Sequence, residues 1–334
     1  MANRKTNDVL SRRMKQMKSD KQTNSKGKRD INVNGFVTGQ VYGVKDGAYI
    51  TKCDETFFSL KPRGKIKNDG LRILVGDFVL VNLDNFSIEN VLPRKSVLVR
   101  PRVANIDQLL ICITIMPEAD LFIADRLIIL AVKNNIEPII VITKSDLNVS
   151  GFKERIEANY KGLGLKILTF STSNQSEAEK LLSILSNKTT AIAGQSGVGK
   201  SSLINAVENS LTIKTSKLSK LNRGKNTTSA SYIYEVGNAK IFDTPGFSVV
   251  DLNESNPIEF LKLYPDIYRF SNFCKYKTCN HLNKTEQECG VVKAINTGDI
   301  NKERFERFMK DYQLLVGLSE KHYKKHKKEI KKDV

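Results

Sequence analysis

The chain has 334 residues, which is long enough for two or three domains, each with its own core. Its 54 Lys and Arg against 36 Asp and Glu give a net charge of +18, which favours a polyanionic partner over a small-molecule enzyme working alone. No apolar run reaches the about 18 residues of a membrane span, and the N-terminus has no apolar signal region. We therefore expect a cytoplasmic protein without a membrane partner.

Two basic segments flank the chain. Residues 1–34 form an arm whose first 30 residues hold ten Lys or Arg and three Asp, and the tail 319–334 holds seven Lys and three acids. Both lack the apolar residues that build a core, so we expect mobile, solvated segments, with residues 1–34 as a disordered arm and residues 319–334 as a basic tail. They are interpreted either as contacts to RNA phosphates, which the size of the excess favours, or as solubilising tails.

Residues 35–98 contain short alternating strands, such as "GFVTGQVYGV" and "DFVLVNL", with Asp46-Gly47 placed as a hairpin turn. This pattern predicts a small β-barrel. A barrel of the oligonucleotide-binding (OB) kind is one option, although periodicity alone does not distinguish it from other barrels. The loop "KPRGKIK" either contacts RNA or is a solvated turn.

From residue 106 buried apolar strands alternate with helical stretches, which indicates a parallel sheet covered on both faces. We predict an α/β domain over residues 99–251.

Two motifs of this domain suit guanine. In "TKSD", Asp146 can accept hydrogen bonds from both donors on the guanine edge, while the Lys144 stem covers the base. Thr143 stands where Asn is commonest. "FSTS" follows the next predicted strand and brings the backbone of Ser171 and Thr172 to the guanine O6. Alone, "TKSD" is a surface turn in most proteins, but beside a phosphate loop it predicts guanine binding.

The phosphate loop is "GQSGVGKS", which matches G-x-x-x-x-G-K-[ST] between an apolar strand and a helical segment. Its backbone amides surround the β-phosphate, Lys200 bridges β- and γ-oxygens, and the Ser201 hydroxyl binds Mg²⁺. The loop residues predicted to bind the nucleotide are Gly194, Gln195, Ser196, Gly197, Val198, Gly199, Lys200, Ser201 and Ser202.

Two further elements predict hydrolysis of GTP to GDP and phosphate. "IFDTPGF" ends a strand in D-x-x-G, where Asp243 can hold Mg²⁺ through water and the Gly246 amide can reach the γ-phosphate. "LNRGKNTTSA" lies between this motif and the phosphate loop. The predicted Mg²⁺ ligands are Ser201, Thr228 and Asp243. The predicted catalytic residues are Lys200, Asn226, Thr227 and Thr228.

The order of these motifs is unusual. The base-reading motifs precede the phosphate loop, whereas an ordinary GTPase has them behind D-x-x-G, so the sequence predicts a circular permutation. Joining the old ends leaves the site intact, because termini of compact domains often lie close together. As a consequence, the γ-phosphate-sensing segment leads directly into the cysteine-bearing region.

Residues 252–318 are predicted to form a helical domain around four metal ligands, Cys274, Cys279, His281 and Cys289. Three thiolates and one imidazole suit a closed tetrahedral structural zinc site. Reactive thiols are the alternative, but no base or partner motif accompanies them.

With its permuted motifs, N-terminal barrel, "RPRVANIDQLLI" and "CKYKTCNH", the chain resembles the bacterial ribosome small subunit-dependent GTPase A family over about residues 35–318. The resemblance implies an OB-type barrel, a circularly permuted P-loop GTPase domain and a helical zinc-binding domain. It also implies a role in late maturation of the small ribosomal subunit, with hydrolysis stimulated by that subunit. The implied partners are the subunit and its rRNA, with GTP and GDP, and we expect a monomer.

Three features depart from the usual GTPase pattern or from the family pattern. Phe247 stands where many GTPases carry a water-orienting Gln, and Asn226 stands where the family motif has His. Asn can position a water but cannot accept its proton, so either positioning suffices or the ribosome supplies the missing group. Seven residues, not the usual five, separate His281 from Cys289.

Two other functions compete with this interpretation. A GTP-gated RNA-binding scaffold would use the nucleotide to set affinity, with hydrolysis incidental. An ATP-driven RNA remodeller is disfavoured by "TKSD" and by the lack of helicase-like motifs.

Overall fold

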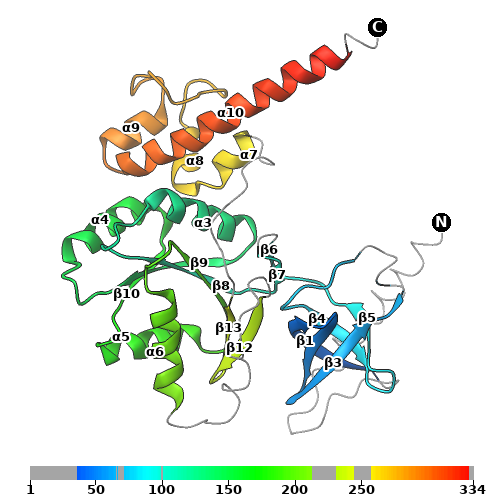
Figure 1. The fold of residues 1–334 in the computed structure, drawn as a ribbon. Coiled ribbons are helices and arrows are strands. Elements are labelled where there is room, and N and C mark those ends of the chain that lie inside the picture. Colours follow the sequence, from blue (N-terminus) through cyan, green and yellow to red (C-terminus); the bar gives the residue numbers. More distant parts are fainter. Residues whose placement is uncertain are drawn as a thin grey trace, which may run out of the picture.

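The structure is a computed structural model that describes residues 36–64, 66, 71–98, 101–212, 231–243 and 257–330. A small barrel stands beside one edge of an α/β domain, and a group of helices covers one side of that domain (Figure 1). The predicted arm of residues 1–34 lies outside the described residues. No helix in the described ranges is long and apolar enough to cross a membrane. The domain boundaries set from the sequence remain predictions.

The barrel is closed by five strands in the order β1-β2-β3-β5-β4, the strand number of an OB-fold barrel. The strands are β1 (Phe36–Lys45), β2 (Ala48–Cys53), β3 (Thr56–Pro62), β4 (Phe78–Asn82) and β5 (Ser87–Val91). Asp46 and Gly47 have φ angles of 51° and 76°, so the predicted hairpin turn between β1 and β2 uses left-handed backbone at both positions. Alternate residues of each strand fill the barrel core, among them Val41, Leu60 and Val79.

The α/β domain is built on a six-stranded sheet of order β10-β9-β8-β11-β13-β12, in which only β12 runs antiparallel. A two-stranded ribbon, β6 (Val97–Leu98) and β7 (Val103–Ala104), precedes it. The sheet strands are β8 (Gln108–Ile113), β9 (Glu137–Thr143), β10 (Lys166–Phe170), β11 (Thr189–Gly194), β12 (Tyr232–Val236) and β13 (Ala239–Asp243).

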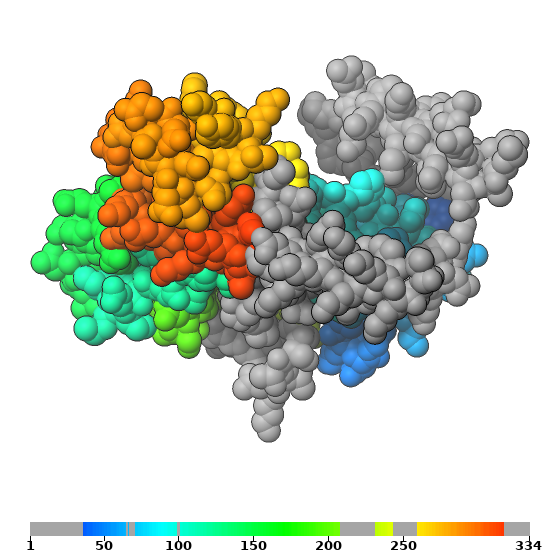
Figure 2. Space-filling view, turned by 90° about the horizontal axis from the view of Figure 1, so that it is seen from above, coloured from blue at the N-terminus to red at the C-terminus, as the bar shows by residue number. Residues whose placement is uncertain are grey.

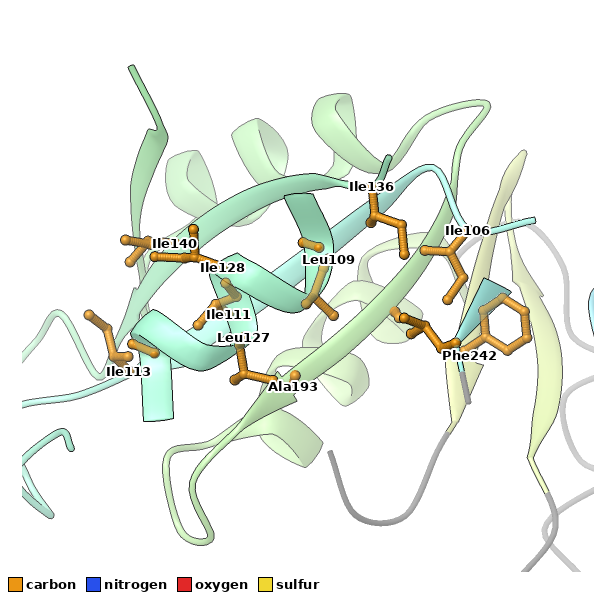
Figure 3. Packing of buried hydrophobic residues seen from close by; sticks show 14 of the residues in the cluster. Ile106, Leu109, Ile111, Ile113, Leu127, Ile128, Ile136, Ile140, Ala193 and Phe242 are labelled. Carbon is orange, nitrogen blue, oxygen red and sulfur yellow. The ribbon is translucent and has the colours of Figure 1, made fainter. Parts of the chain in front are cut away.

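Helices cover both faces of this sheet, as predicted. One face carries α3 (Leu121–Lys133) and α4 (Ser150–Tyr160), and the other carries α5 (Gln175–Leu185) and α6 (Lys200–Thr212). On the central strand β8, Leu109 and Ile111 pack toward α3 (Figure 3). Leu110 and Cys112 pack toward α5 and α6 on the other face. Because successive side chains of a strand alternate between faces, an unbroken apolar run on β8 fills both cores.

The C-terminal part is helical: α7 (Pro257–Lys262), α8 (Pro265–Ser271), α9 (Gly290–Asn296) and α10 (Lys302–Ile330). Its core is a group of buried rings, in which Phe308 stacks on Phe260 at 6.1 Å and meets Tyr264 edge-on at 4.8 Å between centroids. The backbone of α10 stays helical to Ile330, so the basic tail that begins at residue 319 continues this helix. Lys and Glu are good helix formers, and they extend a helix whose first turns are already fixed by packing.

A buried ionic cluster joins this helical domain to the α/β domain. Arg304 of α10, 1% exposed, donates to Asp125 of α3 at 2.9 Å and to both carboxylate oxygens of Asp266 in α8. Arg307 and Tyr160 also donate to Asp125, at 2.6 and 2.7 Å. Two helices of the C-terminal part, α8 and α10, are thereby joined to α3 and α4 of the sheet domain by one set of charge-assisted hydrogen bonds.

The barrel is attached to the opposite part of the sheet domain, at the β12–β13 hairpin. Glu235 of β12 accepts hydrogen bonds from Tyr42 and, at 2.9 Å, from Lys52. The Tyr232 ring lies against Gly43, where an added Cβ would be 2.3 Å from the ring, and the Tyr232 hydroxyl donates to the Val44 carbonyl at 2.8 Å. Gly43 is therefore required for the barrel to approach the edge strand closely.

Candidate nucleotide and metal sites

The phosphate loop follows β11 and leads into α6, which begins at Lys200, as the sequence predicts. The neighbours β8 and β11 connect onward in opposite directions across the sheet, which makes their carboxyl ends the topological switch point where α/β sheets bind ligands. Gly194 passes so close to β8 that a Cβ would lie 2.3 Å from the Cys112 carbonyl oxygen. Only glycine fits this entry to the loop.

Lys200 is folded back over this loop. Its Nζ donates to the carbonyl oxygens of Gly194 and Gln195, each at 2.8 Å. Desolvation lowers the pKa of Lys200, because burial disfavours its charged form. An anion bound at the loop would stabilise the charged form of Lys200 and raise its pKa again. Val198 is buried at 1% exposure, whereas the side chains of Ser196, Ser201 and Ser202 are exposed.

The base-reading strand is tied directly to the phosphate loop. Thr143 ends β9 and is 2% exposed, and its hydroxyl contacts the Val198 carbonyl and lies 3.1 Å from the carbonyl of Ile113. Lys144 donates from Nζ to the Met116 carbonyl at 2.7 Å. The Thr that replaces the commoner Asn therefore keeps a hydrogen bond between the two motifs.

Asp146 and Ser171, from the two motifs predicted to bind guanine, are in direct contact. Ser171 Oγ donates to Asp146 Oδ1 at 2.8 Å, which turns the carboxylate toward the end of β10. Within the described ranges no hydrogen bond reaches Oδ2 of Asp146. Thr172 is exposed beside this pair. A carboxylate held on one oxygen and free on the other suits the recognition of two adjacent N–H donors.

Sequence reasoning missed Glu177, which braces both base-reading loops. Its carboxylate accepts from Ser145 Oγ at 2.6 Å and from Thr169 Oγ1, so it links the turn that follows β9 to the last part of β10. Asn174 caps α5 by accepting from the Glu177 amide at 3.4 Å. The sequence signal is the N-x-x-E spacing of a helix start directly behind "FSTS".

The predicted γ-phosphate side is only partly described. β13 lies beside β11, with Ala191 opposite Phe242, so its last residue, Asp243, reaches the same edge of the sheet as the phosphate loop. The side chain of Asp243 is outside the description. Five further residues from the sequence analysis also lie outside the described residues: Asn226, Thr227, Thr228, Gly246 and Phe247.

The four predicted metal ligands come together between α8 and α9. Their ligand atoms all lie within 4.8 Å of one another. The separations are 3.6 Å for Cys274 Sγ to both Cys289 Sγ and His281 Nδ1, and 3.4 Å for His281 Nδ1 to Cys289 Sγ. A tetrahedral ion with bonds of about 2.3 Å to sulfur and about 2.0 Å to nitrogen separates its ligands by about 3.5–3.8 Å. The residues therefore fit a tetrahedral metal ion.

The surroundings of these ligands favour a bound cation. Burial raises the pKa of the Cys289 thiol to about 12 and lowers the pKa of His281. Neutral imidazole is the ligand form, but a buried thiolate needs a nearby positive charge. The seven-residue spacing does not disturb the set, because Lys275 N bonds to the Glu288 carbonyl at 2.9 Å and closes the longer loop.

Comparisons with known proteins agree with this geometry. The family model "RsgA GTPase" matches residues 91–253, and the model "50S ribosome-binding GTPase" matches residues 189–332. A protein of Thermotoga maritima named small ribosomal subunit biogenesis GTPase RsgA is 38% identical over 275 residues, covering 78% of this chain and 90% of the relative. One of Listeria monocytogenes, named small ribosomal subunit biogenesis GTPase RsgA 2, is 33% identical over 288 residues, covering 84% and 98%.

Solved structures match over most of the chain. The crystal structure of YjeQ from Thermotoga maritima superposes with a TM-score of 0.72 at 32% identity, covering 84% of this chain and 99% of that one. YloQ, described as a circularly permuted GTPase, shares the fold with a TM-score of 0.70 at 24% identity, covering 87% and 98%. The motif order, the sheet and these matches agree: the chain is a circularly permuted P-loop GTPase and belongs to the RsgA GTPase family.

Proposed function

We propose that this chain assists late maturation of the small ribosomal subunit, and that the subunit stimulates its hydrolysis of GTP to GDP and phosphate. The proposal depends on one observation: the phosphate loop and the residues proposed to bind guanine lie at the same edge of the sheet, where the Thr143 hydroxyl contacts the Val198 carbonyl. The relatives named for small-subunit biogenesis supply the biological setting.

At the proposed nucleotide site each motif has one task. Asp146, oriented by Ser171, accepts the two guanine donors, and Lys144 covers the base. The amides of residues 194–199 and Lys200 bind the phosphates, with Thr172 close to O6. A bound Mg²⁺, held by Ser201, Thr228 and Asp243, would neutralise phosphate charge.

Hydrolysis is proposed to be slow in the free protein. Phe247 cannot orient a water, and Asn226 can position a water without accepting its proton. Thr227 and Thr228 would close over a bound metal ion, and the Gly246 amide would donate to the γ-phosphate. The remaining acceleration is assigned to the bound subunit, which either orders these residues or contributes a group of its own.

The other parts of the chain are proposed to bind the subunit. One zinc ion held by Cys274, Cys279, His281 and Cys289 shapes the helical domain. The OB-type barrel, the basic arm of residues 1–34 and the zinc domain contact rRNA in a monomeric, cytoplasmic protein.

GTP turnover measured alone, with purified small subunits and with purified large subunits tests this proposal. We expect slow turnover alone and a large increase with small subunits only, mainly in kcat. Stimulation by large subunits alone would contradict the proposed partner. Equal single-turnover rates with and without small subunits, with GTP-dependent binding retained, would instead favour the GTP-gated scaffold.

A further inference from the structure

Two aromatic rings stand in solvent on the loop that carries the first metal ligands. The loop joins α8 to α9 and lies on the side of the helical domain away from the sheet (Figures 1 and 2). Phe273 is 74% exposed and Tyr276 is 48% exposed. They flank Cys274, with Lys275 and Lys277 on either side of Tyr276. We call Phe273, Lys275, Tyr276 and Lys277 the zinc-loop surface.

Several contacts fix the backbone of this surface. A Cβ on Gly290 would lie 2.6 Å from Phe273 Cβ and 2.5 Å from the Phe270 carbonyl, so glycine is needed where α9 starts against the loop. Hydrogen bonds from Phe273 N to Phe270 O, at 3.1 Å, and from Cys279 N to Tyr276 O, at 3.1 Å, close its turns. The neighbouring Cys274 belongs to the metal cluster. The backbone that carries the two exposed rings is therefore closed by hydrogen bonds and close packing, which reduces the backbone entropy lost on binding.

The zinc-loop surface is also basic. Lys275 places its ammonium 5.6 Å from the centroid of the Tyr276 ring, and in the described part of the chain neither Lys275 nor Lys277 forms a salt bridge. Glu288 is the nearby acid, and its carboxylate is engaged by the amide and hydroxyl of Thr285, at 3.2 and 3.1 Å. The ammonium groups of Lys275 and Lys277 therefore belong to the same surface as the two exposed rings.

This combination matches the chemistry of single-stranded nucleic acid. Unpaired bases stack on aromatic rings, while neighbouring cations bind the backbone phosphates. A duplex would use the lysines only, since its bases are already stacked. We propose that the zinc-loop surface binds unpaired RNA bases, with Phe273 and Tyr276 as stacking platforms and Lys275 and Lys277 as phosphate contacts. This inference rests on the proposed function, which supplies rRNA as the partner. It adds that the bound RNA is unpaired and names the residues that bind it.

The chain has no Trp, which allows a site-specific test. The variant Phe273→Trp in the full-length zinc-loaded protein carries a single indole in the zinc-loop surface. Titration with decamers of adenylate or uridylate is expected to quench this indole, because a base stacks on it. A duplex of the same length, and the matched control Leu314→Trp, exposed on α10, should show little quenching. One zinc per chain and an unchanged circular dichroism spectrum confirm that each variant is folded.

Further changes in the Phe273→Trp background separate stacking from charge. Tyr276→Ala should raise the dissociation constant about five- to a hundredfold, the usual loss for one stacked base, and Tyr276→Phe should restore it. Lys277→Ala should lower the slope of log affinity against log salt by about 0.7. Absence of quenching in Phe273→Trp, equal quenching by duplex, or unchanged affinity in Tyr276→Ala would each overturn the inference. The titration uses neither nucleotide nor subunit, so its failure is separate from a failure of subunit-stimulated turnover.

Discussion

Replacing Arg304 by Ala should weaken the attachment of the helical domain to the α/β domain and lower the free energy of unfolding. Arg304 is almost completely buried and is the partner that the described residues provide for Asp266. Burial opposes its charge, but Asp125 and Asp266 raise the pKa of Arg304, so it stays ionised. The variant therefore leaves one carboxylate buried without a cation.

The magnitude follows from which carboxylates keep a partner. Asp125 retains Arg307, at 2.6 Å, and Tyr160, at 2.7 Å, so its loss is partial. Asp266 is 4% exposed and loses both hydrogen bonds. Breaking a buried pair from one side costs about 3–5 kcal/mol, and we expect a value in that range for Arg304→Ala.

Urea unfolding followed by far-ultraviolet circular dichroism measures this free energy. Arg155→Ala is the matched control, because Arg155 joins the same two domains through Glu303 at 3.3 Å but is about half exposed. Its loss should stay below about 1 kcal/mol. Adding Asp266→Ala to Arg304→Ala should recover part of the stability, since the stranded carboxylate is removed. Equal losses for Arg304→Ala and Arg155→Ala would refute the assignment of the cluster as the main ionic attachment.

Four further predictions concern the proposed sites. Asp146→Asn should weaken GTP and favour xanthosine triphosphate, whose altered edge matches an amide, and a competition assay that still prefers GTP would contradict it. Cys289→Ser should lower zinc content below one per chain and loosen the helical domain, as elemental analysis and circular dichroism would show. Removing residues 1–30 should weaken subunit binding and flatten its salt dependence. Asn226→His should speed intrinsic hydrolysis about ten- to a hundredfold if a side-chain base is missing, and an unchanged subunit-stimulated rate in Asn226→Ala would exclude a role for this position.

The spacing of neighbouring residues was enough to predict the parts of the site that lie within one short segment of the chain. The phosphate loop needs glycines at fixed positions before a helix, and the metal ligands sit on one loop, so both are readable from neighbouring residues. The barrel and the covered parallel sheet were also predicted correctly, because strand periodicity and apolar runs report burial. The OB-type assignment came from the family resemblance, since alternation does not encode strand order.

Contacts between distant segments were not predictable in this way. Glu177 acts on Ser145 and Thr169, and its role appears only once β9 and β10 are neighbours. The same holds for Arg304, whose sequence context is an ordinary charged helix and whose partner Asp125 lies 179 residues away.

The permutation gives the two attached domains different relations to the nucleotide. The hairpin of β12 and β13 lies in sequence between the threonines at 227–228 and the D-x-x-G motif, and the barrel is fastened to it through Glu235. A change at either γ-phosphate segment that shifts this hairpin must therefore shift the barrel or break those bonds. The helical domain is fastened to α3 and α4 instead, through Asp125. Because α3 begins where the Asp120 amide donates to Gln195 of the phosphate loop, at 3.3 Å, that domain is linked to the part of the site proposed to bind the phosphates that GTP and GDP share.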